Sequence, residues 1–225
     1  MNLNNWSENG PVSLEYVTTT EGELGYRIGK STTLTANGYQ TRFTDPILHS
    51  YRDSLGSSYL NGSITGRFGL DLRFSWETKR TTVLASYGFN RPMNASAPSE
   101  VELPDSSSNG ITALPEQRGS LVIAVDASPS FTLRANANYR GEVWSYGATG
   151  QINDQLSLIA WPAELTVNAG LTWRPKASMR LAVDIGCRNI TDTRRTLIGP
   201  VRNDTTPFAL NGREYTFGIT YKFIQ

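Results

Sequence analysis

The side chains of this chain that could do chemistry are charged residues placed at every second position of otherwise apolar segments. Alternate residues of a strand share one face. Guanidinium groups on such a face can bind an anion or pair with carboxylates, but they supply neither a nucleophile nor a general base. We therefore expect one polar face with the following candidates: Arg67, Asp71, Arg73, Arg134, Arg140, Asp184 and Arg188.

Catalytic and metal chemistry have few residues to use. The chain contains one cysteine, Cys187, and one histidine, His49. A lone cysteine can form neither an internal disulfide nor a cysteine zinc cluster. Ser-His-Asp chemistry needs a positioned imidazole, whereas His49 lies in a polar segment beside Tyr51 and Arg52. We expect no catalytic site, no metal site and no cofactor, and therefore not an enzyme.

Charge and composition limit the classes of partner. The chain has 225 residues, 21 basic and 20 acidic side chains, and a formal net charge of +1, which disfavours a nucleic-acid partner. No apolar run approaches the roughly 20 residues of a membrane-spanning helix. The first ten residues contain neither a basic nor an apolar signal region, so we interpret the chain as lacking a secretory signal peptide.

The elements that must position the charged face are long strands. Alternation of polar and apolar residues predicts about nine of them, at 17–28, 32–43, 60–76, 81–90, 120–126, 131–144, 165–173, 179–192 and 214–223. Tight turns near residues 30, 78, 128 and 177 alternate with longer connections, which include 49–58, 92–114, 146–157 and 196–207. The pattern is typical of an antiparallel meander with short turns at one end of the sheet and long loops at the other.

The last strand shows the pattern most clearly. Its apolar residues occupy every second position from Tyr215 to Phe223, and three further aromatic residues near the tight turns are Tyr26, Trp76 and Trp173. Apolar-out and polar-in strands, short turns on one side and aromatic girdles predict an all-β, antiparallel transmembrane β-barrel. A soluble β-sandwich also alternates, but its strands average only about 5–6 residues.

An odd number of strands has a consequence for closure. With nine strands, the first begins at the long-loop side and the last ends at the tight-turn side. Bacterial single-chain barrels have an even number of strands, so we expect the missing ones to come from preceding sequence or from another chain. We also expect the last strand to pair with 179–192 on one edge and to be open or badly closed on the other.

Several motifs resemble the C-terminal part of TonB-dependent outer-membrane receptors, which combine a plug with a barrel of about 22 strands. Residues 20–27, TEGELGYR, resemble the family's TYELGYR strand, with Gly22 in place of tyrosine. Residues 69–72, GLDL, resemble its GLELE strand, and 115–118 resemble its strand start after a long loop. Residues 188–195, RNITDTRR, resemble the NLTDKRY segment of the penultimate strand, and the motifs occur in the family's order.

The final strand carries a second resemblance. Its Thr216, Gly218, Tyr221 and Phe223 match the polar-x-Gly-x-x-aromatic-x-aromatic signal that the barrel assembly machinery of Gram-negative bacteria reads. Two residues, Ile224 and Gln225, follow the aromatic residue that normally ends such chains. The resemblance implies that this machinery is a partner during assembly.

The resemblance implies a partial outer-membrane β-barrel domain over residues 1–225, without a plug, in the outer membrane of a Gram-negative bacterium. The complete receptor would take up a scarce nutrient such as a ferric siderophore, with energy delivered by an inner-membrane complex through the plug. Its partners would be outer-membrane lipid, the N-terminal barrel and plug, and a small-molecule ligand, contacted by the long loops. A fragment, a truncated reading frame and half of a split receptor all fit this sequence.

Other interpretations stay open at this point. A self-contained small outer-membrane barrel with a structural or adhesive role would also alternate in this way. A soluble sandwich could bind carbohydrate through Trp144 and Trp161. The arginines of the polar face could attract an anionic iron chelate in the lumen, or they could simply pair with Asp71, Asp184 and glutamates of neighbouring strands.

Overall fold

The structure is a computed structural model that describes residues 12–52, 56–62, 65–93, 114–147, 157–175, 180–194, 196–197 and 208–223. Strands are the only regular elements in these ranges. The described residues contain no helix that is long and apolar enough to cross a membrane. The main strands are β1 (Tyr16–Ile28), β2 (Thr32–Thr44), β5 (Thr65–Glu77), β6 (Thr81–Met93), β7 (Gln117–Ser128), β8 (Phe131–Arg140), β11 (Glu164–Trp173), β12 (Leu181–Arg188) and β15 (Glu214–Tyr221).

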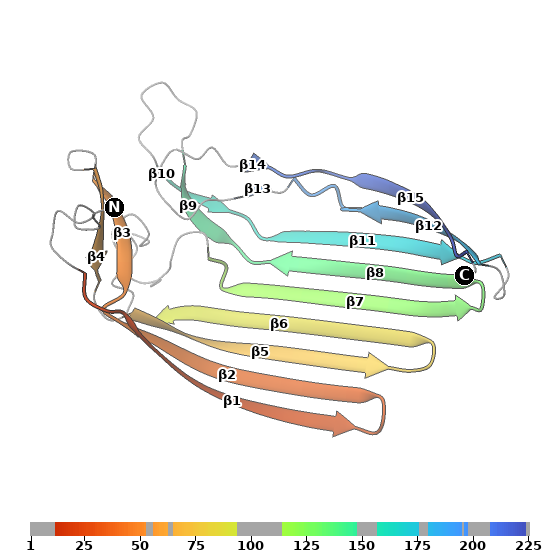
Figure 1. The fold of residues 1–225 in the computed structure, drawn as a ribbon, viewed down its shortest axis with the longest axis horizontal. Coiled ribbons are helices and arrows are strands. Elements are labelled where there is room, and N and C mark those ends of the chain that lie inside the picture. Colours follow the sequence, from red (N-terminus) through yellow and green to blue (C-terminus); the bar gives the residue numbers. More distant parts are fainter. Residues whose placement is uncertain are drawn as a thin grey trace.

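These strands form one nine-stranded sheet in which each strand lies beside its predecessor, in the order β1-β2-β5-β6-β7-β8-β11-β12-β15. All pairings are antiparallel. Figure 1 shows them side by side in a single layer. The predicted all-β antiparallel meander of nine strands is confirmed.

The two ends of the sheet differ as expected. Tight connections at 29–31, 78–80 and 129–130 lie at one end, on the right in Figure 1, where β11 also ends and β12 begins. The first of these turns uses Gly29, whose φ of 62° favours a residue without a side chain. The predicted turn near residue 177 lies outside the described residues. The longer connections all leave from the opposite end, on the left in Figure 1, where β1 begins. β15 ends at the tight-turn end.

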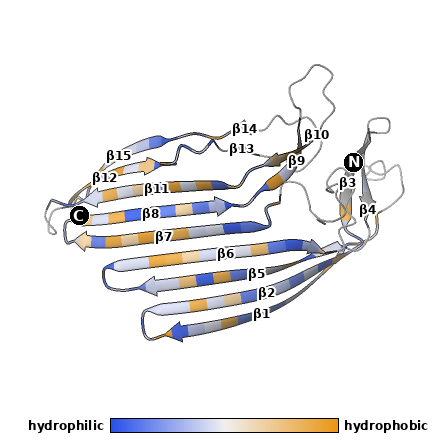
Figure 2. Cartoon of the chain, turned by 180° about the vertical axis from the view of Figure 1, so that it is seen from behind, coloured by the Kyte–Doolittle hydropathy of each residue, from blue (hydrophilic) through white to orange (hydrophobic). Residues whose placement is uncertain are grey.

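The sheet is inside out relative to a soluble protein: its large apolar side chains are exposed, and most of its buried side chains are polar. Val143 is the only buried hydrophobic residue in the described part of the chain, whereas Leu24 and Phe217 keep 81% and 70% of their surface exposed. The side chains that are buried include threonines such as Thr132 and Thr172. Hydrophobic and hydrophilic residues alternate along the strands (Figure 2). Transfer of each large apolar side chain from water to lipid would contribute roughly 1.5–3 kcal/mol, so the exposed face is suited to a bilayer.

No second layer covers that face within the described ranges. Every contact between described elements runs between paired strands, so the sandwich interpretation has no support in this part of the chain. β1 and β15 each pair on one side only, which leaves an open sheet among the described strands. The predicted pairing of the last strand with its predecessor is therefore confirmed. The open state of its other edge stays a prediction for the chain as a whole.

The long-connection end holds additional short strands that the sequence pattern did not predict. The expected loop 49–58 and the start of the expected strand 60–76 form a hairpin of β3 (Ile47–Arg52) and β4 (Gly56–Asn61). β2 stops before Asp45, whose φ of 52° bends the chain, and Asn61 Nδ2 donates to the Asp45 carbonyl at 2.8 Å. A separate small hairpin of this kind keeps the polar segment paired outside the main sheet.

Two further expected strands are shorter than predicted, for similar reasons. Residues 131–144 divide into β8 and β9 (Val143–Gly147) at Gly141, and β9 pairs with β10 (Ser157–Trp161). The expected strand 179–192 ends at Arg188, because Asn189 and Asp192 adopt φ values of 50° and 53°. A two-residue pair, β13 (Thr196–Leu197) with β14 (Phe208–Ala209), precedes β15. The predicted loop segments 94–113, 148–156 and 198–207 lie outside the described residues.

Candidate functional site

The strand register places all of the charged candidates on one face of the sheet. Asp71 of β5 lies opposite Asn37 of β2 and Gly88 of β6, and the alternation continues strand by strand. The polar face, as named here, comprises the odd-numbered residues of β1, β2 and β5 and the even-numbered residues of the six strands that follow. It includes Arg67, Asp71, Arg73, Arg134, Arg140, Asp184 and Arg188. The opposite side is the apolar face.

A recess of about 410 Å³ lies at the middle of this polar face. Gly88 forms its floor, because a Cβ there would stand 2.8 Å from Asp71 Oδ1 and 3.0 Å from Arg118 Nε. The missing side chain allows these two charges, from β5 and β7, to approach across the strand between them. Arg118 Nη2 lies 4.0 Å from Asp71 Oδ1. Ser86 and Ser120 line the recess and share a hydrogen bond of 2.8 Å.

A second ion pair continues the row of charges. Arg140 Nη2 lies 3.0 Å from Glu164 Oε1, and the glutamate side chain is only 13% exposed. Arg140 stands directly opposite Arg118 in the register. Like charges in that position repel, and each arginine is instead balanced by a carboxylate on its far side. Arg140 Nε meets no hydrogen-bond acceptor within the described residues.

Nearer the tight turns, arginines reach carboxylates through threonine hydroxyls. Arg134 Nη1 donates to Thr172 Oγ1 at 2.7 Å, and that hydroxyl donates to Asp184 Oδ1 at 2.6 Å. Arg174, Thr132 and Asp126 repeat the arrangement, with distances of 3.2 Å and 2.7 Å. A hydroxyl can donate and accept at once, so each threonine connects a cation and an anion that do not touch.

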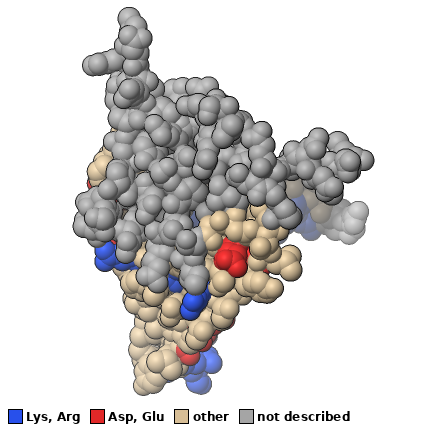
Figure 3. Space-filling model, turned by 90° about the vertical axis from the view of Figure 1, so that its left-hand side faces the viewer, with Lys and Arg blue, Asp and Glu red and all other residues tan. Residues whose placement is uncertain are grey.

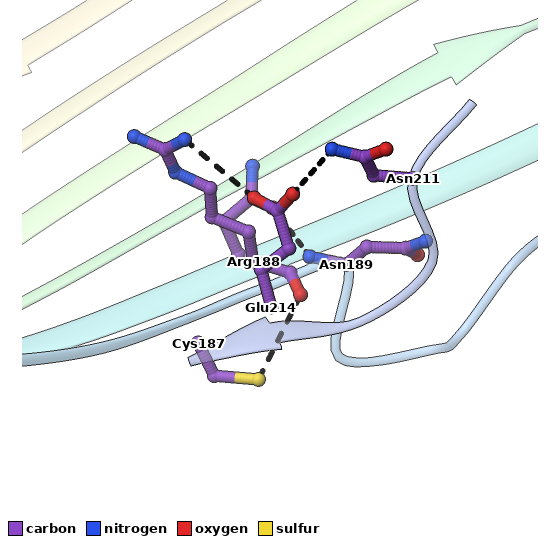
Figure 4. A network of polar contacts seen from close by, with 6 residues as sticks. Cys187, Arg188, Asn189, Asn211 and Glu214 are labelled. Atoms are coloured by element: carbon purple, nitrogen blue, oxygen red, sulfur yellow. Dashed lines mark hydrogen bonds and ion pairs between the residues drawn. The ribbon is translucent and has the colours of Figure 1, made fainter. Parts of the chain in front are cut away.

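At the long-connection end of β12, a carboxylate joins two strands. Glu214 Oε2 lies 3.7 Å from Arg188 Nη1, and Glu214 Oε1 accepts a hydrogen bond of 2.6 Å from Asn211 Nδ2. Figure 4 shows Arg188 and Asn211 approaching Glu214 from different sides. Cys187, drawn beside them, points away and lies in the alternating series of the apolar face. In that position the thiol is a small apolar side chain of the sheet surface.

Two arginines of the polar face remain available. Arg67 and Arg73 are exposed and have no ion pair or hydrogen bond with any other described side chain. Figure 3, seen from the long-connection end, shows basic and acidic side chains in small separate groups on the described surface. The arrangement can hold an anion by charge, but it contains no nucleophile paired with a base. The described ranges contain no cluster of three or more residues suited to a metal ion.

We predict that Thr172→Val destabilises the sheet by about 1–2 kcal/mol, because the Arg134 and Asp184 groups would lose their shared hydroxyl. Thr172 is 3% exposed, so water cannot replace that hydroxyl easily. Denaturant unfolding in detergent or lipid measures the change. The control is Thr220→Val, which lies exposed on the same face of β15 and has no such bond. Equal losses for both variants would contradict the bridging role of Thr172.

Comparison with known proteins gives the architecture its family. The family model described as "TonB dependent receptor-like, beta-barrel" matches residues 1–190. This chain belongs to that family. The family consists of receptors and transporters of the Gram-negative outer membrane rather than enzymes. No curated protein matches this chain.

Solved structures share the fold of this TonB-dependent receptor barrel. The ferric-catecholate import receptor Fiu from E. coli K12 is 17% identical with a TM-score of 0.69, over 93% of this chain and 28% of Fiu. The FrpB iron transporter from Neisseria meningitidis is 15% identical with a TM-score of 0.65, over 96% of this chain and 33% of FrpB. The copper transporter OprC is 16% identical with a TM-score of 0.64, over 94% and 31%. The chain thus spans only a third or less of these proteins.

The residues of the predicted assembly signal lie at the free edge of the receptor sheet. Thr216 and Gly218 occupy the polar face of β15, and Tyr221 lies on the apolar face. The rings of Tyr221 and Phe223 meet edge to face, with centroids 4.9 Å apart. Phe223 follows the end of β15 and is 85% exposed. Whether the assembly machinery reads these residues stays a prediction.

The most structured part of the polar face includes residues that were not among the predicted candidates. Arg118, Gly88, Glu164 and Thr172 supply the recess, the second ion pair and the bridging hydroxyl. A signal for Glu164 was present, because it immediately precedes Leu165 and so has the parity of the polar face. Their pairing depends on register between residues of different strands, 12 or more positions apart in the sequence, which alternation within one strand does not reveal.

Proposed function

We propose that this chain forms the C-terminal barrel segment of an outer-membrane receptor that imports a scarce nutrient, most suitably a ferric siderophore. The observation that carries the proposal is the inside-out sheet of a TonB-dependent receptor family member, with an exposed apolar face and a charged opposite face. Two of the similar solved proteins are an import receptor for ferric catecholate and an iron transporter. The nutrient itself rests on that similarity.

In this proposal the polar face lines the lumen of the complete barrel. The ion pairs of Asp71, Arg140 and Arg188 then hold the wall rigid. Arg67 and Arg73, which have no partner within the described residues, supply positive potential toward an anionic iron chelate. The long connections, which gather at one end of the sheet, would contact the nutrient from outside.

The proposed partners follow from the same placement. Outer-membrane lipid covers the apolar face. The free edges of β1 and β15 accept the remaining strands of the receptor, whose plug fills the lumen and transmits energy from an inner-membrane complex. The barrel assembly machinery reads the final strand. Each of these partners is a hypothesis for this chain.

Disrupting the reading frame that encodes these residues should abolish uptake of one radiolabelled ferric siderophore by the source bacterium under iron limitation. Complementation with Arg67→Gln/Arg73→Gln should restore uptake with a KM raised about two- to thirtyfold, since two exposed charge contacts of about 0.2–1 kcal/mol each are lost. The matched control is Arg42→Gln/Arg91→Gln, which removes the same charge from the apolar face of the same sheet and should leave the KM unchanged.

Uptake of labelled copper, measured in the same cells, distinguishes iron import from copper import, because the copper transporter OprC shares the fold. Unchanged iron uptake with lost copper accumulation would replace the iron proposal by a copper one. Unchanged uptake of both, with the chain present in the outer membrane, would overturn nutrient import.

A further inference from the structure

The apolar face contains a groove of about 700 Å³ over β1, β2, β5 and β6. Two alanines create it. Ala36 lies between Leu24 and Leu72 in one register row, and Ala85 follows Phe74 in the next. The large side chains that form its walls are Leu24, Tyr26, Leu34, Leu72, Phe74 and Tyr87. A lipid-facing surface needs apolar side chains but no such hollow. The groove could therefore select a ligand by its shape as well as by apolar contact.

The two turns beyond this groove are strongly basic. Lys30 lies in the β1–β2 turn, and Lys79 and Arg80 lie in the β5–β6 turn. Arg27, at the end of β1, donates through Nη2 to the carbonyl of Lys30 at 3.3 Å. The next turn, at 129–130 between β7 and β8, contains no basic residue. A second group of basic residues at this end, Arg174, Arg180 and Lys222, lies beside β11, β12 and β15, on strands that do not line the groove, so the two turns below the groove form a separate basic patch.

The distance between groove and turns is within the depth of one leaflet of a bilayer. Lys79 comes five positions after Phe74, and the first three of these steps, to the end of β5 at Glu77, span about 10 Å before the turn begins. One leaflet is about 15 Å deep, half of the roughly 30 Å hydrocarbon core. Trp76, 38% exposed, lies between them at the depth where amphipathic rings prefer the interface.

We propose that the groove and these turns bind an anionic glycerophospholipid. One acyl chain lies over Ala36 and Ala85, and the phosphate contacts Lys30, Lys79 and Arg80. The site rests on the proposed membrane placement of the chain, but not on the nutrient that it imports. Each cation near a membrane surface contributes about 1 kcal/mol toward anionic lipid, whereas the groove supplies contacts that a smooth apolar wall lacks.

The charge of the site also argues against a second copy of the chain as its occupant. Two copies placed groove to groove in one membrane would bring the same basic turns toward each other. Each copy would also leave a hollow opposite a hollow. An anion with a slender apolar tail complements both features, and a second chain complements neither.

The test uses the complete receptor that contains this chain, purified in detergent and transferred to phosphatidylcholine vesicles with or without phosphatidylglycerol. With brominated acyl chains, quenching of tryptophan fluorescence should be stronger for phosphatidylglycerol at equal mole fraction, and Trp76→Phe should remove that excess. Lys30→Gln/Lys79→Gln/Arg80→Gln should weaken the preference for phosphatidylglycerol by about tenfold or more. Ala85→Phe, which fills the groove, should lower retention of both lipids on native mass spectra.

Matched controls exist on the same sheet. Arg174→Gln/Arg180→Gln/Lys222→Gln removes the same charge from other tight-end positions, and Ala137→Phe adds the same ring to the apolar face outside the groove. Both should leave the preference intact. If Ala85→Phe does not fold, the two charge variants decide alone.

Three results would overturn the site. These are equal quenching by both lipids, equal effects of the two charge variants, and a concentration-dependent dimer that Ala85→Phe abolishes. The measurement contains no nutrient, so its failure leaves the import proposal standing. Conversely, a chain that fails to import iron but retains the lipid preference would overturn only the proposed function.

Discussion

Leu121→Arg is expected to destabilise the membrane-inserted chain by about 2–4 kcal/mol, whereas Val122→Arg should change its stability by less than about 1 kcal/mol. The two residues are neighbours near the middle of β7, with exposures of 37% and 40%. Leu121 lies on the apolar face and Val122 on the polar face. A guanidinium at the bilayer midplane loses its hydration, but the same group in an aqueous lumen does not.

The measurement is denaturant unfolding of the complete receptor with either substitution in lipid vesicles, followed by tryptophan fluorescence. Because the pair matches in position, exposure and the group introduced, the difference reports only which face meets lipid. Equal destabilisation would contradict a membrane-facing apolar side. A larger loss for Val122→Arg would mean that the polar face is the covered one, as in a soluble layer packed on that side.

The same alternation explains why most of the fold could be predicted from the sequence. Residues such as Leu70 and Asp71 differ so strongly in polarity that a period of two fixes both the strand and its faces. Short turns with Gly29 or Pro129 then require neighbouring strands to pair in order. A meander needs no long-range information beyond these local signals, and the nine-stranded order follows from them.

The errors lie where local signals weaken. Residues 49–58 are mostly polar, so alternation could not reveal the β3–β4 hairpin, which is held by backbone pairing and by Asn61. In the expected strand 179–192, apolar Ile190 has the parity of the polar face, which breaks the alternation, and Asn189 has already turned the chain. The side chain of Asn189 fixes that turn, because its Oδ1 accepts from the Thr193 amide at 3.0 Å.

The candidate site was predictable in kind but not in detail. Parity placed Arg140 and Asp184 on the correct face, and pairing with carboxylates of neighbouring strands was among the interpretations. The actual partners, Glu164 for Arg140 and Thr172 for Asp184, depend on a register set across several strands. The role of Gly88 is less accessible still, since its effect is the absence of a side chain between two charges.

The second large effect is expected at the C-terminal end of the chain. Tyr221→Ser/Phe223→Ser should lower the amount of chain assembled into the outer membrane by roughly tenfold or more, because loss of aromatic anchors from a recognised segment commonly costs 2 kcal/mol or more. The two rings form an edge-to-face pair, and the adjoining outer edge of β15 has no partner strand among the described residues. A partner protein can recognise an unpaired edge with protruding rings by pairing one of its own strands with that edge.

The measurement is an immunoblot of outer-membrane fractions from cells that express the chain in its complete receptor. Tyr215→Ser/Phe217→Ser is the matched control, since these residues lie on the same face of β15 and are 77% and 70% exposed. They carry as much lipid-facing ring surface but lie outside the signal. Equal losses for both pairs would reduce the effect to general lipid contact.

Gly218→Ala separates recognition from packing even more directly. The nearest atom to an added Cβ would be Asp184 Cβ at 3.9 Å, an ordinary van der Waals distance, so the folded sheet has room for the methyl group. If assembly falls while the stability of the assembled fraction in denaturant is unchanged, Gly218 acts as part of a signal read before the sheet is complete. Parallel losses of assembly and stability would instead place its role in the finished sheet.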